Sequence, residues 1–302
     1  MEETTDWISS LSDDVLTTIL SFVTTKEAVQ TSILSKRWIN TWASVPVLKF
    51  EYDNYLVDGD TGEDLKFEQF VDGVLQNRTA HLDTVMYDCY FDGTFWEPST
   101  EWLDRVVLLK PRVISVKVKT EKCLEWPDSV FSCATLESLK LFLMHPTDFH
   151  FVTPESIALP CLKTLELSGS QLGDNFMQQL FSGCPALESL TLDWCCNFSD
   201  ISSNVLKNLT LNNGCLLYKI LRISCPGLVS LSISSDYYNI GCISLENMVS
   251  LENADIKLVG YEQDDFDIPP NPKLVGGLSN ATCLVLHLKY YPDLQVKIFS
   301  VP

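Results

Sequence analysis

The sequence has little that would support catalysis or the binding of a metal. It contains only four histidines, and none of them belongs to a recognisable acid–base constellation. His145 and His150 lie near each other without a cluster of cysteines or carboxylates beside them. Nucleophile elbows, phosphate-binding glycine loops and HExxH helices do not occur. We therefore predict a protein that is not an enzyme and that holds neither a metal nor a cofactor.

Basic residues are scarce as well. The 21 lysines and arginines stand against 40 aspartates and glutamates, which gives a net charge of -19. This balance argues against a nucleic-acid backbone or an anionic membrane surface as the partner. No apolar run approaches the length of a membrane span, and the first residues lack the basic and apolar regions of a signal peptide. We therefore expect a cytoplasmic or nuclear protein, with no nucleic acid and no membrane among its partners.

The eleven cysteines show no pairing pattern. Their number is odd, no CxxC motif occurs, and the spacing from Cys89 to Cys283 is irregular. The sequence therefore predicts neither a disulfide scaffold nor a zinc site. We expect most of these cysteines to be small buried side chains in a reducing compartment.

Three helix signals lie close together between residues 11 and 42. Ser12 is expected to cap a first helix, Thr24 and Glu27 have the spacing of a capping box that begins a second, and Ser35 begins a third. About 35 residues are too few to bury a core of their own. The segment is therefore either a cap packed on the rest of the chain or a module that offers an apolar face to a partner. Its spaced apolar residues are Leu16, Ile19, Leu20, Val23, Trp38 and Trp42.

Beyond residue 80, a pattern of apolar residues at positions 1, 4 and 6 recurs. The clear copies are Leu136-Leu139-Leu141, Leu162-Leu165-Leu167, Leu187-Leu190-Leu192, Leu206-Leu209-Leu211, Leu228-Leu231-Ile233 and Leu251-Ala254-Ile256. By subtraction they begin 26, 25, 19, 22 and 23 residues apart, close to the roughly 20–29 residues of leucine-rich repeats. Each copy predicts a short strand whose apolar residues point into a solenoid of stacked parallel strands. Weaker copies are Leu82-Val85-Tyr87, Val113-Val116-Val118 and Ala281-Leu284-Leu286.

The segments between these copies are expected to return as helices where their pattern allows. Asp174 or Asn175 would cap a helix that ends at Gly183, and helices are also expected over residues 67–75 and 102–107. Residues 261–273, YEQDDFDIPPNPK, contain acids and three prolines, which predicts a long loop that interrupts the repeat.

Residues 11–42 closely resemble the F-box of plant F-box/leucine-rich-repeat proteins. Residues 71–78, 159–170, 182–195 and 273–288 resemble repeat units of the same family. The usual Leu-Pro at the start of the F-box is Leu11-Ser12 here, and the usual arginine after Trp38 is Ile39. Many relatives carry a further C-terminal FBD domain, which we expect to be missing from this sequence because it ends at Pro302. The matching F-box residues are Leu11, Asp13, Asp14, Leu16, Ile19 to Phe22, Thr25, Lys26, Ala28, Val29, Leu34 to Trp38 and Trp42.

The resemblance implies an α/β protein in which a three-helix F-box at 5–46 precedes a leucine-rich-repeat solenoid at 81–302. Residues 47–80 would be a helical connector or a first irregular repeat. The F-box would bind a Skp-type adaptor and, through it, a cullin–RING ligase, while the repeats hold an unknown target protein for ubiquitination. The implied adaptor contacts are Leu11, Ser12, Val15, Leu16, Ile19, Leu20, Val29, Leu34, Trp38 and Trp42.

In the predicted strands, the side chains at positions 3, 5 and 7 face the concave side of the solenoid. Small hydroxyl and amide groups there suit hydrogen bonding to a protein or peptide, although serine and threonine are also what a solvated sheet face tolerates. The candidate target contacts are Lys140, Phe142, Thr164, Glu166, Ser189, Thr191, Asp193, Asn208, Thr210, Ser230 and Ser232.

Two alternatives to a substrate receptor stay open on the sequence. The first is a leucine-rich-repeat scaffold whose degenerate F-box no longer binds an adaptor, which Ser12 motivates. The second is a receptor that clamps a hormone or an inositol phosphate, for which Lys117, Lys119 and Lys140 are the available basic residues.

Overall fold

The computed structural model divides the chain into two compact units, residues 1–119 and 120–302, which are described here one at a time. The described residues are 7, 8, 10–52, 63–78, 80–89, 99–119, 124–144, 153–213, 220–235, 243–258, 272–288 and 299–300. His145 and His150 lie outside them, as does most of the predicted loop at 261–273.

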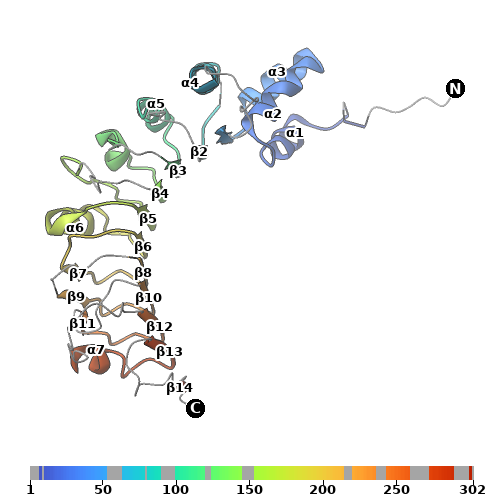
Figure 1. Ribbon diagram of the computed structural model, residues 1–302. Helices are drawn as coiled ribbons and strands as arrows, with labels where there is room; N and C mark the ends of the chain where they lie inside the picture. Colours follow the sequence, from blue (N-terminus) through green and yellow to red (C-terminus); the bar gives the residue numbers. More distant parts are fainter. Residues whose placement is uncertain are drawn as a thin grey trace. The chain divides into compact units, whose positions relative to one another are not determined.

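The first unit begins with the three predicted helices, α1 (Asp13–Leu20), α2 (Thr25–Gln30) and α3 (Lys36–Ala43), with a short 3₁₀ turn η1 (Thr31–Ile33) before α3 (Figure 1). The Ser12 side chain accepts a hydrogen bond from the Val15 N–H at 3.4 Å, which confirms it as the cap of α1. The capping box between Thr24 and Glu27 is also formed. Ser35 precedes α3 in an extended conformation, without a capping hydrogen bond of its side chain.

The rest of the first unit alternates strands and helices: β1 (Val47–Glu51), α4 (Glu63–Gln76), β2 (Thr84–Cys89), α5 (Trp102–Leu108) and β3 (Val113–Lys119). The strands pair in parallel in the order β1-β2-β3. Aromatic rings fill the space between sheet and helices: Tyr52 and Tyr87 both contact Phe67, at centroid distances of 5.3 and 5.5 Å. Strand β1 was not predicted by the repeat pattern.

The register of β3 differs from the prediction. Val85 and Tyr87 of β2 align with Ile114 and Val116 of β3, so the repeat pattern is shifted by two residues from Val113-Val116-Val118. Val113 is only half-buried, whereas Ile114 is fully buried. The run of β-branched residues in this strand gives two apolar frames, and burial against the layer below selects one of them.

The second unit is built on a parallel sheet whose described strands are β4 (Ser138–Met144), β5 (Thr164–Ser168), β6 (Ser189–Asp193), β8 (Asn208–Asn212), β10 (Ser230–Ser235), β12 (Asn253–Leu258) and β13 (Cys283–Leu288). They follow one another in this order, and β14 (Phe299–Ser300) pairs antiparallel with β13. The short 3₁₀ helix η3 (Asp128–Ser132) precedes β4. Leucines at matching positions stack into continuous buried rows, which confirms the predicted repeats. One such row is Leu139, Leu165, Leu190, Leu209, Leu231 and Ala254.

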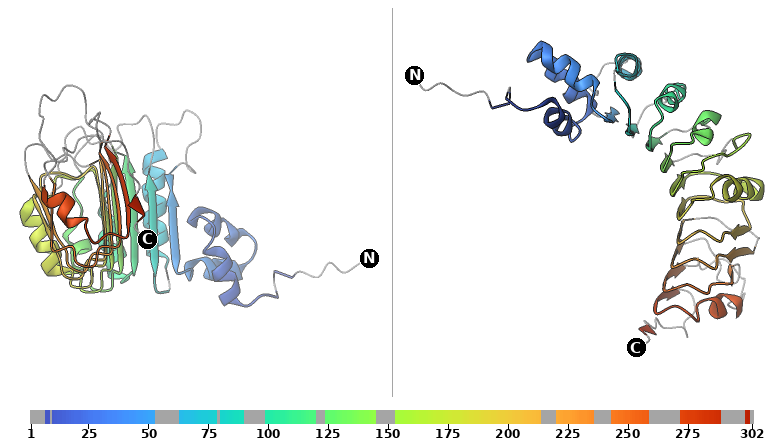
Figure 2. Two further views of the ribbon diagram at one scale, coloured as in Figure 1. Left: turned by 90° about the horizontal axis from the view of Figure 1, so that it is seen from below. Right: turned by 180° about the vertical axis from the view of Figure 1, so that it is seen from behind.

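Two kinds of return segment cover the other side of this sheet (Figures 1 and 2). They are the helices α6 (Gly173–Gly183) and α7 (Pro272–Gly277), and a second parallel sheet in the order β11 (Ile243–Glu246), β9 (Leu221–Ser224), β7 (Asp200–Ser202). Repeat length accounts for the choice. A strand rises about 3.3 Å per residue and a helix about 1.5 Å, so a repeat of 19 to 23 residues crosses the same distance without a helix.

Two predictions about these return segments were wrong. Asp174 does not cap α6; it lies in the first turn of the helix, and its carboxylate accepts hydrogen bonds from the N–H and hydroxyl of Ser199. The predicted loop at 261–273 does not extend to its last two residues, because Pro272 and Lys273 begin α7. Proline is well suited to the first turn of a helix, where its missing N–H has no partner to lose.

Candidate functional site

The N-terminal helices divide their apolar residues between an interior and a surface. Leu16 and Leu20 are 1% and 4% exposed. Leu20 forms a small core with Ala28 and Val45, on which Trp38 and Trp42 pack half-buried. Leu16, Leu20, Trp38 and Trp42 are predicted adaptor contacts, and the structure shows that their side chains also pack inside the module. The spacing predicts an apolar stripe along α1, and the fold shows which residues of that stripe point inward.

A second group of apolar residues remains on the surface of the same helices. Val15 and Ile19 lie four residues apart on one face of α1, and Phe22 lies in the turn that follows this helix. Phe22 and Ile33 are 79% and 89% exposed and are not among the predicted contacts. The available signal was that Phe22 is itself a matching motif residue and that Ile33 directly precedes another, Leu34. The exposed apolar set, as we call it, is Val15, Ile19, Phe22, Ile33, Leu34 and Ile39.

The remaining predicted contacts divide in the same way. Ser12 and Leu34 are exposed, whereas Leu11 and Val29 are half-buried. Arg37 ties the start of α1 to α3, because its guanidinium donates to the Asp13 carboxylate at 2.7 Å and to the Leu11 carbonyl oxygen. The exposed apolar set is thus carried by helices with a core and cross-links of their own.

The eleven candidate target contacts lie on the open face of the sheet of the second unit, and none of them is buried. The strand register places them in three rows across β4 to β10. The first row is Thr164, Ser189, Asn208 and Ser230; the second is Lys140, Glu166, Thr191, Thr210 and Ser232; the third contains Phe142 and Asp193. The structure therefore brings together all the residues that the spacing predicted.

Most charges on this open face neutralise one another. Lys140 and Glu166 form an ion pair at 2.6 Å, and Lys257 and Asp255 form another at 2.8 Å. In the first unit, Lys117 lies 3.4 Å from Asp88. Two of the three lysines that suggested an inositol phosphate site are therefore paired with carboxylates, which argues against an anionic ligand.

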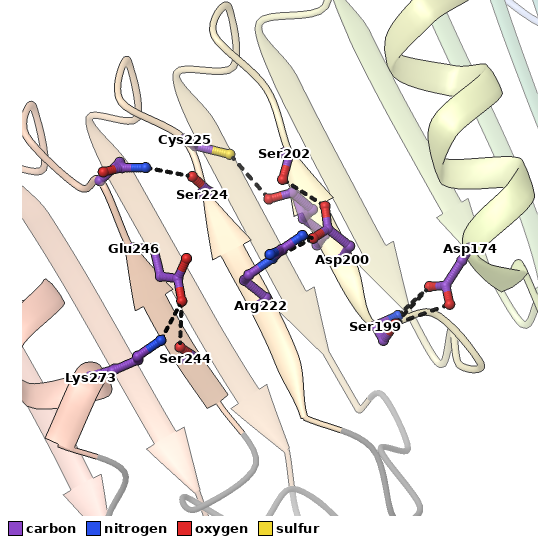
Figure 3. A network of polar contacts seen from close by, with 12 residues as sticks. Asp174, Ser199, Asp200, Ser202, Arg222, Ser224, Cys225, Ser244, Glu246 and Lys273 are labelled. Atoms are coloured by element: carbon purple, nitrogen blue, oxygen red, sulfur yellow. Dashed lines mark hydrogen bonds and ion pairs between the residues drawn. The ribbon is translucent and has the colours of Figure 1, made fainter.

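The second sheet carries a network of polar contacts between repeats (Figure 3). Arg222 of β9 pairs with Asp200 of β7, and Lys273 of α7 pairs with Glu246 of β11 at 2.7 Å. The hydrogen bond from Lys273 lowers the pKa of Glu246 below its ordinary value, and Asp200 raises that of Arg222. Because these charges satisfy one another, the network joins adjacent repeats and offers little to a ligand.

Neither a metal centre nor a membrane span stands out in the described part of the chain. Its histidines, cysteines and carboxylates form no group of three or more that could hold a metal ion. None of its described helices is long and apolar enough to cross a bilayer.

Comparison with known proteins shows which class of protein has this fold. The F-box domain family matches residues 8–50. The repeat family described as "FBD-associated F-box protein At5g56370, LRR repeats" matches residues 101–267. The chain is therefore an F-box protein with leucine-rich repeats. It belongs to the family of FBD-associated F-box proteins of plants, because the match to the repeats of that family covers more than half of the chain.

Several curated relatives come from Arabidopsis thaliana. F-box/LRR-repeat protein At4g14103 is 35% identical over 68% of this chain and 55% of its own length. F-box/LRR-repeat protein At4g14096 is 33% identical over 86% and 58%, and FBD-associated F-box protein At5g27750 is 28% identical over 98% and 71%. The chain spans about half the length of the curated relatives it matches. For F-box protein At1g60400, for example, the match covers 46% of that protein. No solved structure matches the chain.

Proposed function

We propose that this protein is the substrate-recognition subunit of an SCF-type ubiquitin ligase in the cytoplasm or nucleus. Its F-box docks on a Skp-type adaptor, which connects it to a cullin–RING ligase, and the open face of the repeats binds a target protein. No residue of the chain performs chemistry in this mechanism. The protein raises the effective concentration of target lysines near the ubiquitin that the rest of the complex transfers.

The observation that carries this proposal is the exposed apolar set of the N-terminal helices. Six large apolar side chains face solvent within residues 15–39, although the same helices bury Leu16 and Leu20 in a core. Leaving so many large apolar side chains of one small module in water is unfavourable, which supports a binding partner for them. The match of the F-box family to residues 8–50 supports an adaptor as the partner.

The test compares two substitutions at equally exposed side chains. Phe22, in the turn that follows α1, and Leu108 at the end of α5 are both 79% exposed. We expect Phe22→Ala to weaken co-purification with a plant Skp-type adaptor by roughly tenfold or more, as for an aromatic residue anchored in an interface. Leu108→Ala should leave adaptor recovery at the wild-type level. Neither change should lower the thermal midpoint, since both side chains stand in solvent.

Equal loss of adaptor in the two variants, or no loss in either, would contradict the proposed interface. Ile19→Ala provides a second probe, on α1 itself. A variant at Leu20 or Trp38 is not suitable, because both side chains belong to the core of the module and their removal would test folding instead of binding.

A second candidate function is a leucine-rich-repeat scaffold whose F-box does not take part in ubiquitination. The specific observation is Ser12, which has φ -68° and ψ 158°, a conformation that proline also adopts. Serine keeps the cap of α1 but lacks the proline ring that the resembling F-boxes carry. In this case no adaptor would co-purify with the wild-type protein, so Phe22→Ala could not lower adaptor recovery further.

A further inference from the structure

Three neighbouring strands of the second unit end in residues with a left-handed backbone. Gly169 follows β5 with φ 69°, Trp194 follows β6 with φ 52°, and Asn213 follows β8 with φ 50°. Glycine and asparagine adopt this conformation readily, whereas a bulky side chain is strained in it. Bulky residues held in this conformation cluster at binding and active sites.

The surrounding backbone holds Trp194 in this conformation. The Gly169 N–H donates to the Asp193 carbonyl oxygen at 2.9 Å, and the Trp194 N–H donates to that of Asn212 at 2.9 Å. In the same way, the Asn213 N–H donates to the carbonyl oxygen of Ser234 at 2.7 Å. These bonds need no particular side chain at position 194. The tryptophan, which is 43% exposed, is therefore not explained by the turn.

The residue directly before Trp194 is a carboxylate at the end of the open face. Asp193 Oδ1 accepts a hydrogen bond from Asn213 Nδ2 at 3.1 Å, and among the described residues no cation forms an ion pair with Asp193. Partial burial raises its pKa above the ordinary value, an effect that the Asn213 hydrogen bond reduces in part. The two other carboxylates described on this face, Glu166 and Asp255, each have a lysine partner.

We infer that Asp193 and Trp194 form an anchoring subsite for an arginine side chain of the target protein. A guanidinium pairs with a carboxylate through parallel N–H bonds and stacks on an indole ring. The strand end supplies both groups on adjacent residues. The net charge of -19 on the chain favours the approach of a basic segment. The inference rests on the proposed function, because it specifies what the open face would recognise.

The test uses two peptides that differ in one charge. One is a capped five-residue peptide of glycines and serines with a central arginine, and the other has citrulline, the neutral isostere, in its place. The full chain, labelled with 5-fluorotryptophan, is titrated with each peptide and followed by fluorine NMR. Trp194→Asn identifies the resonance of Trp194. We expect this resonance to shift with the arginine peptide, with an affinity about fivefold or more above that for citrulline.

Two variants and one control decide the outcome. Asp193→Asn keeps the acceptor for Asn213 and should weaken binding of the arginine peptide by about fivefold to tenfold. Asp255→Asn removes the same charge from the same face and should leave the affinity unchanged. In Trp194→Asn, which lacks the reporter resonance, neither peptide should shift the remaining tryptophan resonances. The thermal midpoint of this variant should not fall, because asparagine accepts the left-handed conformation.

A Trp194 resonance that does not move, equal affinities for the two peptides, or equal losses in Asp193→Asn and Asp255→Asn would overturn the subsite. None of these results depends on the adaptor. Failure of the subsite is therefore distinguishable from failure of the proposed function, which the recovery of the adaptor with Phe22→Ala reports.

Discussion

Gly183 and Gly73 differ in what a methyl group would meet. A Cβ atom at Gly183, the last residue of α6, would overlap the carbonyl oxygen of Ile157, whereas a Cβ atom at Gly73 within α4 has no neighbour within 4 Å. We expect Gly183→Ala to lower the free energy of unfolding by about 1–3 kcal/mol through overpacking. Gly73→Ala should raise it by about 0.5–1 kcal/mol, since glycine weakens a helix interior. Denaturant titration of both variants measures the contrast, and equal signs would contradict it.

Exposure at single residues is also what limited the sequence-based prediction of the candidate site. The periodicity of α1 placed Leu16, Ile19 and Leu20 on one apolar stripe, which the structure confirms as a stripe. An apolar helix face can be broader than the surface it packs on, however. Leu16 and Leu20 are buried in the module, whereas Ile19 is exposed to solvent. On the open face, strand alternation fixes the direction of each side chain, so every predicted target contact is exposed or half-buried there.

At the scale of elements, the strands of the main sheet were predictable and the return segments only in part. A Leu-x-x-Leu-x-Leu copy fixes a strand locally, because its leucines must share a buried face. Segments such as residues 200–202, 221–224 and 243–246 are too short to show a period, and they become strands by pairing with one another. Strand β1 was missed for a similar reason: it pairs with β2 across the intervening helix α4.

A ladder of opposite charges connects successive strands at their N-terminal ends. Glu137, Lys163, Glu188 and Lys207 directly precede β4, β5, β6 and β8, and the Lys163–Glu137 and Lys207–Glu188 pairs measure 2.9 and 2.7 Å. The hydrogen bond from Lys207 lowers the pKa of Glu188 below its ordinary 4.5. The ladder therefore favours the register in which each strand follows its neighbour, and it does so only while the carboxylates are ionised.

The pH dependence of this contribution follows from the direction of the pKa shift. Because the folded pKa of Glu188 is lowered, its stabilisation is present above pH 4.5 and is lost as the pH falls through the folded value. We expect Lys207→Met to have a slightly lower thermal midpoint than the wild type at pH 7 and the same midpoint at pH 3. Added salt at pH 7 should also reduce the difference. A difference that persists at pH 3 would assign the effect to packing of the side chain.

At the scale of the whole molecule, the division at residue 119 places the F-box and the first repeats in one compact unit. The Lys49 N–H of β1 donates to Thr25 Oγ1 of α2 at 2.7 Å, and Arg78 after α4 donates to the Val45 carbonyl oxygen at 2.8 Å. Burial lowers the pKa of Arg78 to about 10, so this guanidinium depends on the few acceptors it has. The F-box is thus a structural part of the first unit, and deleting it would remove more than a docking surface.

This dependence predicts where a chain truncated before Val47 becomes less stable. Without residues 1–46, Arg78 loses an acceptor, and β1 loses both the Thr25 hydroxyl and the cover of the helices. In a solenoid each repeat is stabilised mainly by its neighbours, so the damage should be local. Hydrogen exchange measured by mass spectrometry should increase in β1 and β2 and stay unchanged in β8, β10 and β12. A uniform increase through β13 would instead show that the repeats fold as one cooperative unit, and loss of adaptor binding in the truncated chain would then say nothing about the interface.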